Sequence, residues 1–570
     1  MAKTKQPPTP KSKSGDPSEV EVRYDLSVLP TAFHKAGLAG LVLLIESLKQ
    51  RRALTAEETK CTVAATEVTV TFTEPLLQKL MDDLYDAREV EVAVKSKWQG
   101  AEVKREETVE EEVDGKKTRT KRFIYDQVQP KGAFFDNVFD GDKEIWRKLW
   151  RDMLWNIPRG RPTTREPFNQ RASGKPCKEG PNAWSELLKV HKARTKKEFH
   201  TAALSSALFP GAQAVNAEAV PFEGRAEENL LLHFWPLTAL LYVPQEIERD
   251  GSTNLPASSY TVAVPDVSDL CEFVTEYPKL LTGLSAEVRG YRPAQAVIDL
   301  PAEGALAFLE DLAVLTRLEI EAGKLRFSIG AVEYLHLVKA GNNVKLMAAG
   351  RVAPDQRLLV GYRAIVRPTG TAPHYRNSLF RRGLLLALLD GESWYQPFGR
   401  SFVTFDAGVF IRQPRKDDEK GPPQFASDAS KKFRHLTTLF TQTLEMAVGD
   451  SVQPPKPLEL LVEQVIKSYL LGKAKAKCNI DKKTKLSALG KDEQKKVYDK
   501  KRDIAAEAFL AARSRRDQDF VKYFSEVICS AGTYFDKKTS DFQVFATALN
   551  DPNKTDSIKA LTLLALSANS

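Results

Sequence analysis

The sequence predicts an α+β protein: a mixed α/β N-terminal body with a β-ribbon and a basic loop, followed by an all-α C-terminal bundle. Over residues 21–411, segments with the polar–apolar alternation of strands are interspersed with segments whose apolar residues have helical spacing. A charged, proline-bearing segment, RQPRKDDEKGPPQFASD, follows at residues 412–428. Beyond it, every apolar pattern has helical spacing, which is typical of a helical bundle.

At 570 residues, the chain is too long for a single core. Composition and patterning divide it into a disordered tail (1–20), an α/β module (21–140), a basic Trp- and Arg-rich segment (141–208), an α/β body (209–411), a linker (412–428) and the helical bundle (429–570). The tail is rich in Lys, Pro and Ser and lacks the apolar stretch of a secretory signal. No apolar run reaches the length of a membrane span, and the five scattered cysteines suggest reduced thiols. We therefore expect a cytoplasmic protein without membrane contact.

The N-terminal module alternates strands and helices. The stretch EVTVTFT alternates strictly between polar and apolar residues and predicts a strand. A turn signal, Asp114-Gly115, predicts a hairpin. The predicted elements are strands at Glu21–Val28, Glu67–Thr73 and Val90–Trp98, a helix at Pro75–Tyr85 and a hairpin over Thr108–Tyr125.

A further helix opens the module within LPTAFHKAGLAGLVLLIESL, where Leu38, Leu41 and Ile45 share one face. Gly37 and Gly40 lie inside it, although each glycine costs about 1 kcal/mol relative to alanine in a helix. Such glycines indicate a close approach, either of another packed segment or of a ligand.

Two regions concentrate positive charge in a chain of net charge +9. Residues 143–197 hold 15 Lys and Arg against 5 Asp and Glu, and residues 472–522 hold 16 against 8. Clustered charge of this kind favours a polyanionic partner such as nucleic acid. In the first region, proline, glycine and serine predict a loop after a short helix that ends near Pro158. Its candidate phosphate contacts are Arg159, Arg161, Arg165, Arg171 and Lys175.

Strand patterns in the body lie at Tyr260–Val264, Ala296–Leu300, Leu325–Ser328, Val344–Ala348 and Gln356–Tyr362. Helices of the bundle are expected at Phe433–Ala447, Pro457–Leu471, Lys491–Arg516, Asp519–Cys529 and Asp556–Leu566. The basic residues of the long third helix are scattered around it, so only a subset can track a nucleic-acid backbone. Lys500 and Arg513 are the candidates we select from it.

The search for enzymatic chemistry gives no candidate. The sequence has no glycine-rich phosphate loop followed by Lys-Ser or Lys-Thr, and no Gly-x-Ser-x-Gly motif. No histidine pairs with another at metal-ligand spacing. We therefore predict no catalytic residue, no metal and no cofactor. His34 and His336 stand in apolar sequence beside lysines, a pattern more typical of a satisfied, partly buried histidine.

Four motifs in order resemble one family: LPTAFHKAGLAGLVLLIESL, LWRDMLWNIPRGRPTTREPFNQRASGKPCKEGPNAW, VEYLHLVKAGNNVK and SWYQPF. Together they resemble the large subunit of type I CRISPR Cascade in its Myxan subtype. The helical tail is similar in character to the small-subunit-like bundle that such subunits often carry.

The resemblance implies a non-catalytic subunit of an RNA-guided surveillance complex. Its implied partners are a CRISPR guide RNA, target double-stranded DNA with its displaced single strand, other Cascade subunits, and a helicase-nuclease or transposition proteins. It also implies recognition of a short adjacent motif and help in opening the duplex. Within the matched motifs, it makes Lys339, Asn342, Asn343 and Lys345 candidate nucleic-acid contacts and His34, Lys35, Gly37 and Gly40 candidate contacts to the guide or a subunit. Two alternatives remain open: a scaffold for acidic protein partners and a stand-alone nuclease.

Overall fold

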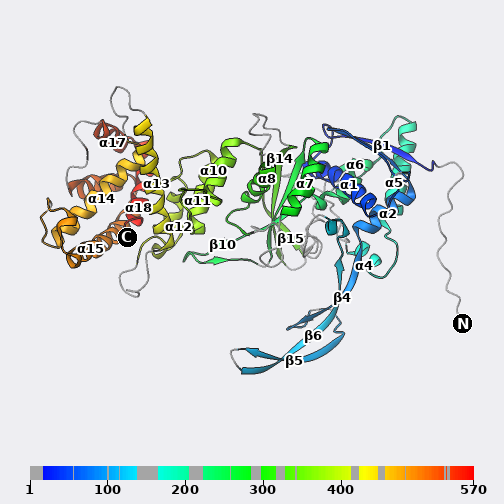
Figure 1. The fold of residues 1–570 in the computed structure, drawn as a ribbon, viewed down its shortest axis with the longest axis horizontal. Coiled ribbons are helices and arrows are strands. Elements are labelled where there is room, and N and C mark those ends of the chain that lie inside the picture. The colour runs from blue at the N-terminus through cyan, green and yellow to red at the C-terminus, as the bar shows by residue number, and fades with distance from the viewer. Residues whose placement is uncertain are drawn as a thin grey trace. The chain divides into compact units, whose positions relative to one another are not determined.

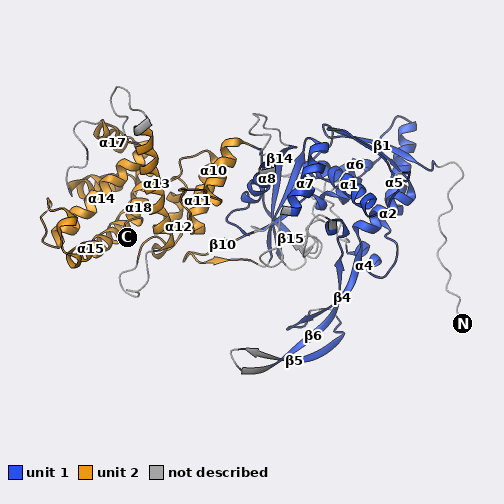
Figure 2. Ribbon diagram, in the orientation of Figure 1, with its two compact units in different colours: residues 1–244, 257–354 blue, residues 245–256, 355–570 orange. Residues whose placement is uncertain are grey.

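The computed structural model describes residues 17–137 (except 56, 99, 101 and 114–115), 165–204, 222–283 (except 257), 297–315, 328–412 (except 341–342), 423–446, 456–531 (except 482), 535 and 540–570. The chain forms two compact units, coloured separately in Figure 2. Unit 1 contains residues 1–244 and 257–354, and unit 2 contains residues 245–256 and 355–570. The fold is mixed α+β at the N-terminal side and helical at the C-terminal side (Figure 1), as the sequence predicts.

Unit 1 begins with a small antiparallel sheet in the order β1-β3-β2. Its strands are β1 (Val20–Asp25), β2 (Lys60–Val63) and β3 (Glu67–Phe72). The predicted opening helix is α1 (Ala32–Gln50), whose side chains are almost all buried, and the predicted second helix is α2 (Glu74–Leu84). Thr73 caps α2, since its hydroxyl oxygen accepts a hydrogen bond from the backbone N–H of Leu76 at 3.2 Å. The predicted strands and helices described here are confirmed, although β1 ends at Asp25 and not at Val28, and β2 was not predicted.

The predicted β-ribbon is a three-stranded antiparallel sheet in the order β4-β6-β5. It consists of β4 (Ala87–Val94), β5 (Arg105–Val113) and β6 (Lys116–Pro130), and Figure 1 shows it projecting from the rest of unit 1. Opposite charges face each other between β5 and β6, where Glu107 lies opposite Arg122. Such cross-strand pairs favour this register.

A five-stranded sheet in the order β13-β9-β12-β14-β15 forms the second part of unit 1. All its pairs are antiparallel except β13 with β9. The central strand β12 (Ser259–Val267) is buried over its whole length and is flanked by β9 (Leu240–Pro244) and β14 (Ile329–Ala340). The remaining strands are β13 (Val297–Ile298) and β15 (Asn343–Val352), and the helices α7 (Leu270–Gly283), α8 (Glu303–Leu315) and α1 complete this core.

The predicted loop after Arg159 is wrong where the chain is described, because it contains two helices, α4 (Glu166–Ala172) and α5 (Glu179–Thr195). Pro167 stands in the first turn of α4, where a proline is tolerated because its missing N–H has no intrahelical partner. Trp184, Leu187 and Val190 recur three apart and bury one face of α5. Shorter segments of unit 1 are η1 (Ala133–Asn137), β7 (Thr201–Leu204), β8 (Phe222–Arg225), α6 (Ala226–Asn229), η4 (Leu230–His233) and η5 (Trp235–Leu237).

Among its described residues, unit 2 is helical apart from the two-stranded ladder β10 (Glu246–Ile247) and β11 (Thr253–Asn254). Its α-helices are α10 (Gln356–Val366), α11 (Ser378–Asp390), α12 (Phe398–Thr404), α13 (Gln424–Met446), α14 (Leu458–Lys477), α15 (Lys491–Arg513), α16 (Asp517–Tyr523), α17 (Asp541–Asn550) and α18 (Thr555–Ser567). One π-helical segment, η8 (Phe524–Ile528), continues α16, and the short η6 (Ala407–Val409), η7 (Leu486–Ala488), η9 (Cys529–Ala531) and η10 (Pro552–Lys554) complete the unit. The helix α18 is buried among the others.

The strand predicted at Gln356–Tyr362 is wrong, because this stretch is the helix α10. Asp355 caps it, since its carboxylate accepts a hydrogen bond from the N–H of Leu358 at 2.9 Å. The helix α17 was not predicted. Helices α10, α11 and α12 pack with the bundle, so the boundary between the compact units lies at residue 354, whereas the sequence placed the start of the bundle at residue 429.

Candidate nucleic-acid interface

The glycines of α1 contact the chain itself. A Cβ at Gly37 would lie 2.8 Å from the carbonyl carbon of Leu231 and closer still to its oxygen. At Gly40, a Cβ would lie 3.0 Å from the carbonyl carbon of Phe234. The backbone of η4, and of Phe234 between η4 and η5, therefore approaches α1 so closely that only glycine fits. This is the packed-segment alternative, and a contact of these buried glycines with a guide or subunit stays a prediction.

His34 is fully buried, and its Nδ1 lies 2.8 Å from the hydroxyl oxygen of Thr31. Burial lowers the pKa of His34 to about 4, and the nearby Asn229 side chain offsets this only in part. The imidazole is therefore neutral at pH 7 and cannot pair electrostatically with a phosphate. His336 on β14 lies 2.9 Å from the hydroxyl of Ser259, which supports the interpretation of a satisfied histidine.

Lys35 connects α1 to β12. Its ammonium group lies 2.8 Å from Oδ1 of Asp266, and the other carboxylate oxygen of Asp266 accepts from Arg351. Glu333 lies beside this group, and its pKa is raised by burial and by the charge of Asp266. Because the two cations lie beside two carboxylates, Asp266 and Glu333, the cluster has little positive charge left for a polyanion.

The basic segment is described only from Arg165 onward, so the candidates Arg159 and Arg161 lie outside the described residues. Arg165 and Lys175 are exposed. Arg171 is held by the chain, because it lies 3.5 Å from Asp82 and donates a hydrogen bond to the carbonyl of Lys175 at 3.1 Å. Of the described candidates in this segment, Arg165 and Lys175 are therefore the ones open to a ligand.

The hairpin of β14 and β15 separates two other candidates. Lys339 lies opposite Val344, and Lys345 lies opposite Val338. Because side chains alternate along a strand, Lys339 and Lys345 point to opposite faces of the sheet and cannot contact one phosphate backbone from the same side. Asn343 begins β15 opposite Ala340, and Asn342 lies outside the described residues.

The two candidates chosen on α15 have partners within unit 2. Arg513 donates a hydrogen bond to the carbonyl of Phe405 at 2.7 Å, and Lys500 lies 3.4 Å from Asp503. Lys501 donates to the side chain of Asn569 at 2.8 Å, and burial lowers its pKa. The contacts of Arg513 and Lys501 anchor α15 to its surroundings, whereas the pair of Lys500 lies within the helix.

A different face of α15 is open. Lys491, Lys495, Tyr498 and Arg502 follow each other at helical spacing and line a shallow hollow of about 370 Å³ together with Gln494 and Asp499. Within the described part of the chain, the side chains of Lys491 and Lys495 form no hydrogen bond or ion pair. Tyr498 follows Lys495 on the next turn and is 47% exposed. We call these four residues the α15 face. The sequence names the cations among them but does not show which ones stay unpaired.

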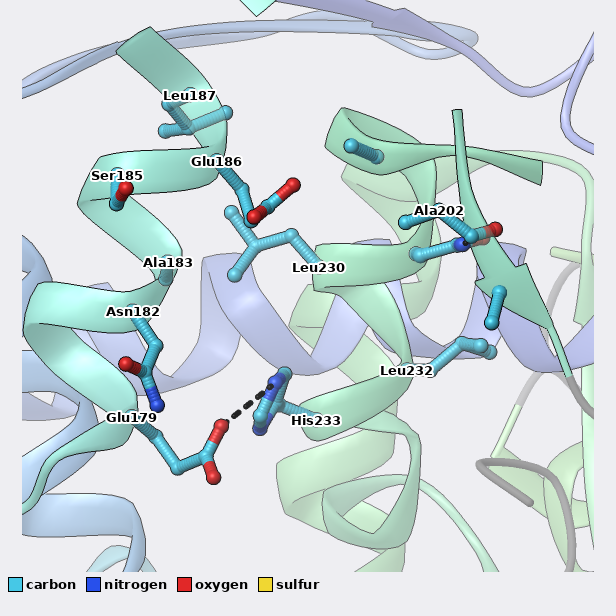
Figure 3. Close-up of a pocket in the computed structure, with 13 residues that line it drawn as sticks. Glu179, Asn182, Ala183, Ser185, Glu186, Leu187, Ala202, Leu230, Leu232 and His233 are labelled. Carbon is cyan, nitrogen blue, oxygen red and sulfur yellow. Dashed lines mark hydrogen bonds and ion pairs between the residues drawn. The ribbon is translucent and has the colours of Figure 1, made fainter. Parts of the chain in front are cut away.

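The pocket between α5 and η4 is lined by carboxylates, in contrast to the basic α15 face. Figure 3 shows Glu179 of α5 facing His233 across a pocket of about 300 Å³, at 3.9 Å between Oε2 and Nε2. Nδ1 of His233 also lies 2.6 Å from the hydroxyl of Tyr85. Glu186 lines the same pocket and lies 2.7 Å from Nε2 of His200. Two carboxylates make this pocket a poor site for a phosphate.

The described residues contain neither a cluster of metal ligands nor a membrane-spanning helix. No group of three or more His, Cys, Asp or Glu side chains is arranged to hold a metal ion there. No helix in those ranges is both long and apolar enough to span a membrane. All five cysteines are described, and each is a free thiol.

Comparison with protein families gives two matches. Residues 60–322 match the N-terminal domain of type I-B CRISPR Cas8b, and residues 329–569 match its C-terminal domain. No curated protein matches the chain. The second match ends at the last helix of unit 2, so the helical bundle is part of the Cas8b C-terminal domain. Because the two domain models follow each other and together span most of the sequence, the chain belongs to the Cas8b family of large subunits of CRISPR Cascade.

Proposed function

We propose that this Cas8b chain binds target DNA within an RNA-guided Cascade complex and does so without catalysis of its own. Membership in the family implies a complex with other subunits and nucleic acids. The observation that supports direct DNA binding is the α15 face, where two lysines without partners stand on the turns of the helix before an exposed tyrosine. Lysines neutralise phosphates, and an aromatic ring offers a surface for a base or a sugar.

Several finer features belong to the same proposal. We infer recognition of a motif adjacent to the target, help in opening the duplex, and recruitment of a helicase-nuclease or of transposition proteins. The Myxan subtype and the small-subunit-like role of the helical bundle also stay predictions. Arg159, Arg161, Arg165 and Lys175 remain the candidate contacts of the basic segment, and Lys339, Asn342, Asn343 and Lys345 those of the hairpin.

The first experiment is to purify the tagged chain with its neighbouring subunits and to sequence the RNA that accompanies it. Short RNAs of uniform length, with a shared repeat-derived end and a variable middle, are expected. A preparation without such RNA, although the other subunits are present, would contradict the proposal and favour the scaffold alternative.

The second experiment measures binding of this complex to a duplex matched to the guide over a series of salt concentrations. The double variant Lys491→Ala/Lys495→Ala is expected to weaken binding and to lower the salt slope by about 1 to 2, because each lost phosphate contact removes nearly one released counterion. The control is Lys522→Ala/Lys554→Ala, which removes two exposed lysines of unit 2 outside α15. Equal effects of the two double variants would show that net charge, and not the α15 face, matters.

A further inference from the structure

One face of the β4–β6 ribbon carries an exposed tryptophan in a fixed position. Trp98 follows the end of β4 and stacks on Tyr125 of β6, with ring centroids 4.5 Å apart and planes inclined by 20°. The backbone N–H of Trp98 donates a hydrogen bond to the hydroxyl of Tyr125 at 2.9 Å. Tyr125 is only 2% exposed, whereas Trp98 is 37% exposed. The pair therefore presents one aromatic surface to solvent on a buried support.

Two lysines lie over a neighbouring aromatic ring on the same face of the sheet as Tyr125. In the strand register, Val94 lies opposite Phe123 and Val92 opposite Tyr125, so Phe123 and Tyr125 share one face of the sheet. The ammonium groups of Lys97 and Lys121 lie 5.1 Å and 5.7 Å from the centre of the Phe123 ring. An aromatic strip flanked by two lysines is thus formed.

Glu106 is the carboxylate that faces these lysines. It pairs with Lys121 and lies 3.0 Å from Lys97, and the hydrogen bonds from the two lysines, with Lys121 the larger, lower its pKa. All three side chains are exposed, and water and salt screen ion pairs between exposed groups, so these pairs contribute little to stability. A phosphate can therefore compete with Glu106 for either lysine at little cost.

We propose that Trp98 is a stacking site for an unpaired base of single-stranded nucleic acid, with Lys97 and Lys121 contacting the neighbouring phosphates. The flat ring of Trp98 can stack on any base. The positive charge of Lys97 and Lys121 favours a phosphodiester chain over an apolar protein segment as the ligand. The inference deepens the proposed DNA binding and rests on it, but it uses a different part of the chain, in unit 1.

The test uses the full chain and labelled single strands, one of thymidines and one of uridines, with binding followed by fluorescence anisotropy. Trp98→Ala is expected to weaken binding roughly 5- to 150-fold, the range that loss of one stacked base gives, without changing the salt slope. Trp98→Phe keeps an aromatic ring and is expected to retain most of the affinity. Lys97→Ala/Lys121→Ala is expected to lower the salt slope. Preference for one strand identifies whether DNA or RNA occupies the site.

The control is Lys491→Ala/Lys495→Ala on the α15 face. If this variant weakens single-strand binding and Trp98→Ala does not, the stacking site is wrong while the proposed DNA binding stands. If neither the parent chain nor any variant binds the thymidine or the uridine strand, both the stacking site and the proposed DNA binding are wrong. If Trp98→Phe loses as much binding as Trp98→Ala, Trp98 has a structural role and does not stack on a base. If the Trp98→Ala complex loses a Cascade subunit, the ribbon face that carries Trp98 binds a neighbouring protein. Either result overturns the stacking site.

Discussion

The backbone carbonyl groups of Leu231 and Phe234 explain why α1 has glycine at positions 37 and 40. Both glycines lie in α1 and face the backbone of Leu231 in η4 and of Phe234 just after it, where any side chain would collide with a main-chain atom. A flexible side chain could move aside, but a backbone carbonyl inside a packed core can move only with the segment that carries it. The cost of the two glycines to the helix is therefore offset by the burial of η4 and η5 against it.

Gly37→Ala is expected to lower the free energy of unfolding by about 3 kcal/mol, because overpacking against a fixed backbone outweighs the gain in helix propensity. The matched control is Gly399→Ala in α12, where a Cβ meets no atom within 4 Å. That variant is expected to stay within about 1 kcal/mol of the parent, on the stabilising side. Urea unfolding measures both. Equal stabilities would show that η4 can shift away from α1.

His34 gives a pH dependence of stability. Its pKa in the folded chain is about 4, against an ordinary value of 6.5, so the unfolded chain binds the proton more readily. The stabilisation is complete above about pH 6.5 and is lost as the pH falls towards 4. The contribution of His34 to the free energy of unfolding is expected to be about 2 kcal/mol lower at pH 5 than at pH 7.

The variant His34→Gln isolates this contribution, because glutamine is polar and of similar size but does not titrate. Urea unfolding of both proteins at pH 7 and pH 5 is the measurement. The loss of stability between the two pH values is expected to be smaller in the variant by this amount. Identical losses would contradict a neutral, buried His34.

At the scale of the element, a capping residue distinguishes a helix from a strand where the apolar pattern fits both. The stretch QRLLVGYRAIV carries apolar residues that fit a short strand, but Leu359 and Tyr362 are three apart and both are buried in α10. Asp355 stands at the cap position just before it, and this signal could have identified the helix from sequence. The same holds for α5, where Trp184, Leu187 and Val190 already show helical spacing.

Asp355→Ala is expected to lower the stability of unit 2 by about 1 kcal/mol, because the N–H of Leu358 loses its acceptor. Asp355→Asn keeps an oxygen at the same place and is expected to retain most of that stability. Chemical unfolding of the full chain, followed by the far-ultraviolet circular dichroism of its helices, compares the two. A neutral alanine variant would show that solvent caps α10 equally well.

At the scale of the whole molecule, the chain holds two compact units, each with its own buried apolar residues. The core of unit 2 is rich in phenylalanine, and Phe509 packs there against Phe402 and Phe410 at centroid distances of 5.6 Å and 5.9 Å. Unit 2 also takes in the short segment 245–256 from the N-terminal half of the sequence.

Two separate unfolding transitions are therefore expected in calorimetry. Phe509→Ala leaves a cavity in unit 2 and is expected to lower the free energy of unfolding of that unit by about 3 to 5 kcal/mol. Gly37→Ala is expected to destabilise unit 1 and to shift the other transition. A single transition that both variants shift together would contradict independent units.

The sequence by itself determined the α+β class, the opening helix with its glycines, the charged ribbon, most of the helices of the bundle and the two concentrations of positive charge. Periodicity and turn signals depend on residues close in the chain, which is why they can be recognised there. The resemblance drawn from four motifs likewise agrees with the Cas8b family at the level of a Cascade large subunit.

Only the tertiary structure decided which charges are open to a ligand and what the glycines meet. Lys35 is paired with Asp266, Arg513 with the carbonyl of Phe405, and Gly37 with Leu231, and each partner is more than 100 residues away. No local pattern encodes these pairs, because they arise when distant segments pack together. The same packing leaves the α15 face and Trp98 exposed, and it is therefore the fold, more than the count of basic residues, that selects the candidate contacts with nucleic acid.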